Sequence, residues 1–268
     1  MKIVLLDDNA HASPYIEAFG RGLTRHGQDF SRQVGGAPPD ADLVVFWGHR
    51  KLMVINKQRA AGHDYLVMER GYVGARFEYT SLGFNGLNGR ADFLNDTVPD
   101  DRLYLFINLM RRWRGLKGRY WAIMGQVAGD ASLAGCDIYN WYQDIIADIK
   151  GRSTQPIVFR PHPLSRQYSS PMGSSLRTGR LSDILADAKA VITYNSNSGV
   201  DAILAGAPTM AQDRGSMAYA VACHKFEDLA DTGEPDRKTW LQRLSYCQWS
   251  SAEIADGIAW QHLKRRYA

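Results

Sequence analysis

Two short segments of the sequence carry side chains suited to binding an anion. The first, FRPHPLS, contains Arg160 and His162, and the second is the run NSNSG at 195–199. Arginine and histidine donate charge-assisted hydrogen bonds to phosphate or carboxylate oxygens. The second run stands where a helix begins, and the first N–H groups of a helix have no partner within it. The segments predict a phosphate site, whose candidate residues are Arg160, His162, Asn195, Ser196, Ser198 and Gly199.

The elements around these segments alternate between strand and helix. Strands are expected at 157–159 and 190–194, and helices at 181–188 and from the NSNSG turn to Leu204. Ligands bind at the carboxyl ends of the strands in open α/β sheets, so both segments are expected at the same edge of one sheet. A plain helix cap and turn, with His162 as a structural histidine between two prolines, is the alternative.

The same alternation along the rest of the chain predicts an α/β protein. Further strands are expected at 2–6, 42–47, 64–68, 120–124 and 209–211, and helices at 14–26, 51–61, 101–113, 138–150, 237–248 and 251–265. The segments 31–41 and 71–100, rich in glycine, are expected to be loops. We expect two Rossmann-like domains that face a cleft, and C-terminal helices that pack across them. The predicted ranges are 1–118, 119–235 and 236–268.

Composition narrows the class of protein. The chain has 268 residues, of which 45% are hydrophobic and 22% charged, as in ordinary globular proteins. It holds no apolar run near the roughly 20 residues of a membrane span. The N-terminal run MKIVLLDDNA is expected to be a strand and not a signal peptide. Three scattered cysteines predict neither disulfides nor a zinc site. We therefore expect a cytoplasmic protein without a metal.

A basic segment with interleaved aromatic residues precedes the strand at 120–124. The run from Arg111 to Trp121 holds five basic side chains, three aromatic ones and no acid, in a chain of net charge +4. Such a pattern is typical of nucleic-acid surfaces, and equally of a solvated linker between domains. If the segment is a nucleic-acid surface, the residues expected to contact DNA are Arg111, Arg112, Trp113, Arg114, Lys117 and Arg119.

Three motifs resemble those of the capsule polysaccharide biosynthesis family, which includes retaining transferases for 3-deoxy-octulosonic acid. His162-Pro163 matches the HP dipeptide that follows a strand in that family. The Ser-rich turn that runs on through an acid, Ala-Leu and Gly-x-Pro is matched by Ser196, Ser198, Gly199, Asp201, Ala202 and Gly206-Ala207-Pro208. The Q-x-x-x-D motif and its later Glu are matched by Gln126, Asp130 and Asp137. The likeness spans roughly residues 120–222, and the first half is similar in arrangement to small phage-encoded members.

The resemblance implies a GT-B-type glycosyltransferase with a nucleotide-activated donor, a UDP-, GDP- or CMP-sugar, and no metal. In such an enzyme Asp130 would act at the reacting carbon as nucleophile or base, with Gln126 and Asp137 beside it. Asp201 would face the nucleotide ribose, and His162 would bind the donor phosphate with Arg160. Asp137 and Asp201 stand where the family has Glu, and a group displaced by about 1 Å can lose roughly a hundredfold in rate.

Two acceptors fit this reading. The resemblance favours a glycan, and the basic segment favours the hydroxymethylated bases of DNA, flipped out of the helix, in a bacterial or phage-infected cell. The sequence gives a slight preference for DNA. A nucleotide-sugar epimerase or hydrolase, and a binding module without activity, are the other functions this fold allows. The oligomeric state is not predicted.

Overall fold

The computed structural model describes residues 1–8, 10–165 and 169–268, and it divides the chain into two compact units. The first unit comprises Met1–Arg102 and Gln242–Ala268, and the second comprises Leu103–Leu241. The division differs from the predicted ranges in two respects. Residues 103–118 group with the second unit, and residues 242–268 return to the first.

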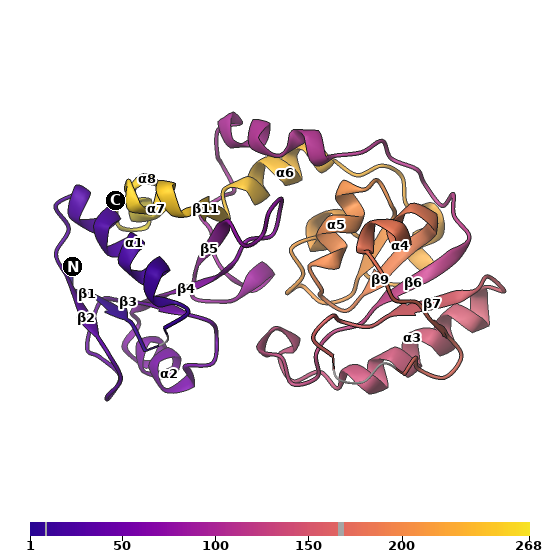
Figure 1. Cartoon of the computed structure of the whole chain (residues 1–268), viewed down its shortest axis with the longest axis horizontal. Helices are drawn as coiled ribbons and strands as arrows, with labels where there is room; N and C mark the ends of the chain where they lie inside the picture. The colour runs from indigo at the N-terminus through magenta and orange to yellow at the C-terminus, as the bar shows by residue number, and fades with distance from the viewer. Residues whose placement is uncertain (9, 166–168) are drawn as a thin grey trace. The chain divides into compact units, whose positions relative to one another are not determined.

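A six-stranded sheet forms the centre of the first unit (Figure 1). Its strands lie in the order β11-β5-β4-β3-β1-β2. Four of them pair in parallel, whereas β5 and β11 are antiparallel to their neighbours. The strand bounds are β1 Ile3–Leu6, β2 Phe30–Gln33, β3 Leu43–Trp47, β4 Asp64–Arg70, β5 Tyr79–Phe84 and β11 Gln248–Ser250.

Helices cover this sheet because each has one apolar face. The bounds are α1 Ser13–Arg25, α2 Leu52–Ala61, α7 Ser251–Ala255 and α8 Ile258–Leu263, with 3₁₀ turns at Asn88–Arg90 and Lys264–Tyr267. α1 packs against α7 and α8. Phe19, Trp249 and Trp260 fill the core between these helices and the sheet. Removing such large apolar side chains from water is the main driving force for this packing.

A five-stranded, wholly parallel sheet forms the centre of the second unit, with strands in the order β10-β9-β6-β7-β8. Their bounds are β6 Tyr120–Met124, β7 Ile157–Arg160, β8 Ser175–Leu176, β9 Ala188–Thr193 and β10 Thr209–Ala211. The bounds of the helices are α3 Ile138–Arg152, α4 Leu181–Asp187, α5 Ser198–Leu204 and α6 Arg237–Ser245, and α6 runs on into the first unit. Short 3₁₀ turns cover Asp101–Leu105, Ile107–Leu109, Ala131–Leu133, Tyr219–Val221 and Glu227–Asp231.

Both faces of this sheet are covered, as its apolar strands require. Ile145 and Ile149 of α3 pack on one face with Ile123 of β6. On the other face, Ile184 of α4 and Ala202 of α5 pack with Val191 of β9. The predicted α/β fold class, with parallel sheets and C-terminal helices, is confirmed.

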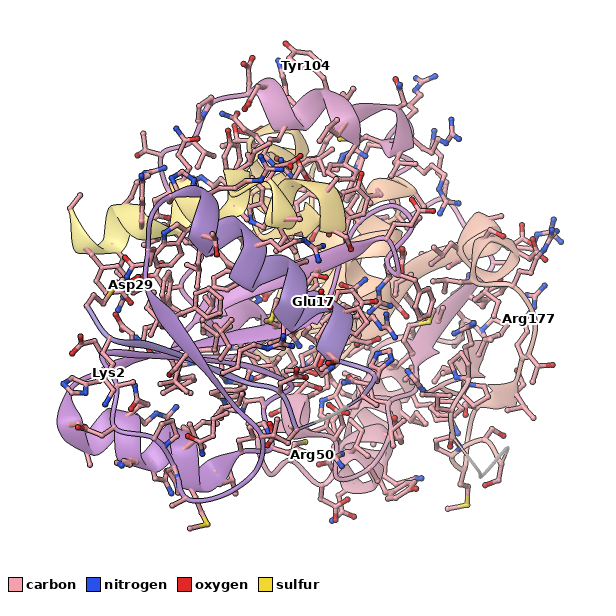
Figure 2. All side chains as sticks on the ribbon, turned by 60° about the vertical axis from the view of Figure 1, so that its left-hand side comes forward. Lys2, Glu17, Asp29, Arg50, Tyr104 and Arg177 are labelled. Atoms are coloured by element: carbon pink, nitrogen blue, oxygen red, sulfur yellow. The ribbon has the colours of Figure 1, made fainter. Side chains whose placement is uncertain are left out.

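Several predicted elements are wrong in type. The segment 101–113 is not a helix but two 3₁₀ turns, in which Leu103 and Phe106, three residues apart, are buried while Tyr104 is exposed (Figure 2). The predicted loop 71–100 contains β5, and the loop 31–41 begins inside β2. The helix expected over 251–265 breaks at Gly257, whose φ of +81° is a left-handed conformation that favours glycine.

Candidate functional site

Polar side chains follow four neighbouring strands of the second unit at the edge where the strands end. Gln126 follows β6, His162 follows β7, Asn195 follows β9 and Asp213 follows β10. The strands are brought close there by Gly125, whose N–H donates to the carbonyl of Arg160 at 2.7 Å. A Cβ on Gly125 would lie 2.9 Å from that oxygen, so this close approach needs glycine.

Gln126 and Asn195 join two of these strand ends. The Gln126 amide donates to Asn195 Oδ1 at 2.7 Å, and Gln126 Oε1 accepts the Asn195 backbone N–H at 3.0 Å. Asn195 is only 4% exposed, and its amide nitrogen donates to Asp213 Oδ2 and to the carbonyl of Ser132, both at 2.7 Å. Each polar atom of the Asn195 side chain therefore has a partner, as a buried amide requires.

The serine turn before α5 is held by its own hydrogen bonds. The Ser198 N–H donates to Ser196 Oγ at 3.2 Å, and the Gly199 N–H donates to the Ser196 carbonyl at 3.0 Å. A Cβ on Gly199 would lie 3.3 Å from Ala218 Cβ, so dense packing is a sufficient reason for glycine there. The geometry is that of a capped turn. The phosphate-cradle role of Ser196, Ser198 and Gly199 stays a prediction.

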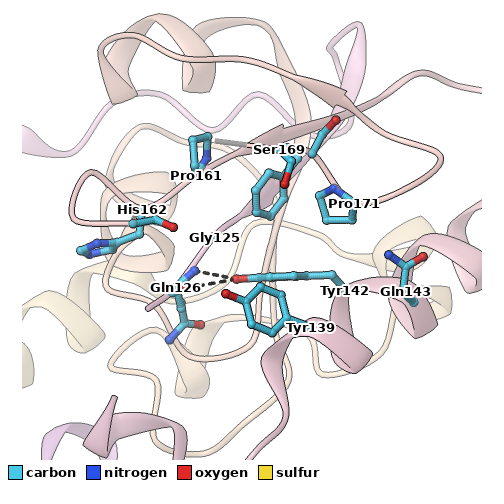
Figure 3. A pocket seen from close by; sticks show the side chains of 12 residues that line it. Gly125, Gln126, Tyr139, Tyr142, Gln143, Pro161, His162, Ser169 and Pro171 are labelled. Atoms are coloured by element: carbon cyan, nitrogen blue, oxygen red, sulfur yellow. Dashed lines mark hydrogen bonds between the residues drawn. The ribbon is translucent and has the colours of Figure 1, made fainter. Parts of the chain in front are cut away.

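A pocket of about 140 Å³ opens beside this edge (Figure 3). Tyr139, Tyr142 and Phe159 supply its aromatic walls, and the polar lining includes Gln126, Gln143 and His162. The orientation of the Tyr142 ring is fixed by a hydrogen bond, because its hydroxyl accepts the Gln126 backbone N–H at 2.7 Å. Burial raises the pKa of Tyr142 to about 12, so the phenol is neutral at physiological pH.

His162 lies at the pocket with a defined tautomer. Its Nδ1 accepts the backbone N–H of Leu164 at 3.2 Å. A nitrogen that accepts carries no hydrogen, so the neutral ring is protonated at Nε2. This is the tautomer that can donate to a phosphate oxygen.

Arg160 and Asp201 form a second polar group near the same edge. Burial lowers the pKa of Arg160, and the nearby Asp201 carboxylate opposes that change. The Arg160 Nε is buried and has no hydrogen-bond partner among the described residues. A buried donor without a partner is costly unless a ligand supplies an acceptor.

Asp130 and Asp137 both lie in the segment between β6 and α3, and both are exposed. Asp130 accepts the Ser132 N–H at 2.9 Å and so caps the turn that contains Ser132. The carbonyl of Ser132 in turn accepts a hydrogen bond from the Asn195 side-chain amide. Asp137 caps α3 by accepting the N–H groups of Tyr139 and Asn140 at 3.0 and 3.2 Å. Both carboxylates thus have a local structural partner.

The basic segment lies at the opposite edge of this sheet. It precedes β6, and the Arg111 and Arg114 N–H groups donate to the carbonyls of Leu204 and Gly206, which stand just before β10. The five-residue β6 separates the two edges by about 15 Å, at roughly 3.3 Å per residue.

The arginines of this segment differ in their surroundings. The Arg114 guanidinium donates to the carbonyls of Ala186 and Leu185 at 2.5 and 2.6 Å, at the end of α4. Trp113 lies under the Arg237 guanidinium, 5.3 Å from the ring centre. The remaining cations, Arg111, Arg112, Lys117 and Arg119, are exposed.

Sequence reasoning missed Tyr139, Tyr142 and Asp213. The signal for the tyrosines was present, because residues three apart at the start of a helix lie on the same face. Asp213 stands two residues after the strand predicted at 209–211, much as the other site residues follow theirs. Only its pairing with Asn195 needed the structure.

Within residues 1–8, 10–165 and 169–268, no three His, Cys, Asp or Glu side chains are grouped so as to hold a metal ion. In those same ranges no helix has both the length and the apolar character to cross a bilayer.

Comparisons with known proteins identify the fold. No protein-family model matches the chain, and neither does any curated protein sequence. KpsC, a beta Kdo 2,4 transferase of Thermosulfurimonas dismutans, has a similar structure, with a TM-score of 0.61 and 14% identity over 92% of this chain and 90% of that one. The beta Kdo 2,7 transferase described for KpsC of the same organism has a TM-score of 0.59 and 14% identity over 100% of both chains. The chain therefore shares its fold, a GT-B-like pair of α/β units, with these two Kdo transferases.

Proposed function

We propose that this chain is a glycosyltransferase that moves a sugar from a nucleotide-activated donor to an acceptor hydroxyl. The observation that carries the proposal is the aromatic pocket beside His162, at the edge where the strands end, in a fold shared with two sugar transferases. That edge is where α/β sheets bind ligands.

The pocket suits the base of the donor. Its volume of about 140 Å³ is close to the ~150 Å³ of a cavity that holds one benzene ring. A single-ring pyrimidine matches that size better than a two-ring purine. The proposed donor is therefore a UDP- or CMP-sugar, with the base against the aromatic walls of the pocket and a phosphate near His162 Nε2.

The reaction breaks the bond between the anomeric carbon and the donor phosphate and forms a bond from that carbon to the acceptor oxygen. The acceptor proton passes to a base, and the nucleotide leaves with the negative charge. Asp130 is the proposed group at the reacting carbon, since a carboxylate stabilises an oxocarbenium-like state. Arg160 and His162 would stabilise the leaving phosphate. For Asp137 we propose only the cap of α3.

The acceptor proposed is a glycan hydroxyl, with a hydroxymethylated DNA base as the alternative. The case for DNA depended on the basic segment, and its position at the opposite strand edge gives that case less support. DNA transfer is still tested, because the alternative predicts binding that weakens steeply with salt.

The test is a transfer assay with UDP-, GDP- and CMP-sugars against a short glycan, hydroxymethylated DNA, plain DNA and no acceptor. His162→Ala and Asp130→Asn test the site, and Arg112→Ala is the control at the other edge. Nucleotide release that needs an acceptor and falls at least tenfold in both site variants supports the proposal. Altered sugar without an acceptor would indicate an epimerase or hydrolase. Thermal stabilisation by a donor without turnover would indicate a binding module.

A further inference from the structure

A second group of binding side chains lies in the first unit, at the edge where its parallel strands end. Trp47 is the last residue of β3 and Arg70 the last residue of β4. Tyr15 comes from the first turn of α1 and His11 from the segment before it. Phe77, in the connection between β4 and β5, is 76% exposed. None of these five residues takes part in the pocket described above.

Arg70 lies at the centre of this aromatic group. Its guanidinium carbon is 4.7 Å from the centre of the Phe77 ring and 5.6 Å from that of the Trp47 ring. Its terminal nitrogens donate to Tyr15 Oη at 3.2 Å and to His11 Nε2 at 2.8 Å. The rings and these bonds fix the plane of the guanidinium, so little side-chain entropy is lost when it binds a ligand.

The Arg70 charge has no counter-ion among the described carboxylates. A guanidinium has five N–H groups, and two of those of Arg70 are used by Tyr15 and His11. The remaining N–H groups can bind a carboxylate as a fork.

The charges nearby limit the kind of ligand. Two of the other cations at this edge are paired, Arg32 with Asp7 and Lys51 with Asp8, whereas Arg50 is exposed. Nucleic acid requires several unpaired cations along its backbone, and this edge also carries the carboxylates of Asp7 and Asp8, which follow β1. One fixed cation among ring faces suits a ligand with one anionic group and an apolar face. A sugar ring that carries a carboxylate meets both requirements, because its C–H groups pack against the negative faces of aromatic rings.

We propose that Arg70, Trp47, Tyr15 and Phe77 form a binding site for an acidic saccharide, with the sugar carboxylate on the Arg70 guanidinium and the sugar ring on the aromatic side chains. The assignment of this saccharide as the acceptor rests on the proposed transferase function. The site itself requires neither a donor nor turnover.

The test is calorimetric titration of the full chain with tetragalacturonate, with its fully methyl-esterified form as the neutral probe and hydroxymethylated duplex DNA as the competing class. Arg70→Ala removes the cation, Arg70→Lys keeps the charge but loses the fork, and Phe77→Ala removes an exposed ring. Arg50→Ala removes an exposed arginine three residues after β3 (Figure 2) and is the matched control. Thermal unfolding of each variant shows that it is folded.

We expect the acid to bind and the methyl ester to bind at least tenfold more weakly. Arg70→Ala should weaken acid binding about tenfold or more, Arg70→Lys and Phe77→Ala severalfold, and Arg50→Ala not at all. Equal binding of acid and ester, equal losses in Arg70→Ala and Arg50→Ala, tighter binding of DNA, or no binding in the millimolar range would each overturn the site. Because no donor is present, this result is independent of whether transfer is detected.

Discussion

The two edges of the second unit's sheet use polar residues in different ways. Where the strands end, Gln126 and Asn195 form a closed network, His162 lines the pocket, and the Arg160 Nε is buried without a hydrogen-bond partner among the described residues. Where the strands begin, Arg114 caps the carbonyls at the end of α4. Arg237 likewise donates to the carbonyls of Arg111 and Ile203.

This difference shows that charge density alone is a poor guide to a binding site. The basic segment holds five basic side chains, yet the Arg114 guanidinium is bound to backbone carbonyls of α4. At the other edge, the uncharged side chain of Gln126 lines the pocket. The position of a residue at a strand end is therefore more informative than its charge.

The largest effect is expected from Asn195→Ala. It removes a buried amide and leaves Gln126, Asp213 and the Ser132 carbonyl without their partner. Leaving buried polar groups unsatisfied costs about 1–3 kcal/mol each, so we expect the free energy of unfolding to fall by about 3 kcal/mol. Transfer should fall at least a hundredfold. Urea unfolding and the transfer assay measure these changes.

Asn108, an exposed amide on the 3₁₀ segment, provides the matched control. Asn108→Ala should change the free energy of unfolding by less than about 0.5 kcal/mol. Equal effects of the two substitutions would contradict the network.

Arg237→Ala should destabilise the protein without altering the chemistry. The side chain is 4% exposed and pairs with Glu234 as well as with the two carbonyls. We expect a loss of about 2–3 kcal/mol in the free energy of unfolding. The rate of transfer per folded molecule should be unchanged. Arg112→Ala, an exposed neighbour, should leave both quantities unchanged. A fall in donor affinity in either variant would place a binding function at this edge.

Buried strands with polar residues at their ends predicted the edge that carries Gln126, His162 and Asn195. The basic segment precedes a predicted strand, so its place at the other edge was also implied.

Other features depended on contacts far apart in the chain. β11 pairs with β5, about 170 residues earlier; β11 has only three residues, and the apolar run of β5 is interrupted by Thr80, Ser81 and Gly83. The 3₁₀ turns at 101–109 were mistaken for a helix, because a spacing of three residues is shared by both structures. The aromatic group around Arg70 required the ends of β3 and β4 and the start of α1 to be brought together.

Tyr139→Ala should weaken donor binding about tenfold while kcat stays the same, because the ring forms a wall of the pocket and takes no part in bond breaking. Tyr104→Ala, which removes a tyrosine that is 62% exposed, is the control. The measurement is the KM for UDP-, CMP- and GDP-sugars. A larger loss for a GDP-sugar than for the pyrimidine donors would contradict a single-ring pocket.

The smallest effect concerns pH. Burial raises the pKa of Tyr142 to about 12, above the ordinary value of about 10 in the unfolded chain. The folded state therefore retains this proton longer than the unfolded state, and the associated stability is complete below pH 10 and is lost as the pH rises towards 12.

Tyr142→Phe should remove this dependence. Between pH 9 and pH 11, the free energy of unfolding of the parent chain should fall by about 1 kcal/mol more than that of the variant. Urea titrations at both pH values measure the difference. Parallel curves would show that the Tyr142 hydroxyl is not held as described.

The most direct test of the account is hydrogen–deuterium exchange of the full chain with and without CMP or UDP. The account predicts slower exchange in peptides that cover 125–143 and 160–165, and unchanged exchange in 111–119. Slower exchange in 111–119, with none at the pocket, would contradict the claim that the nucleotide binds where the strands end.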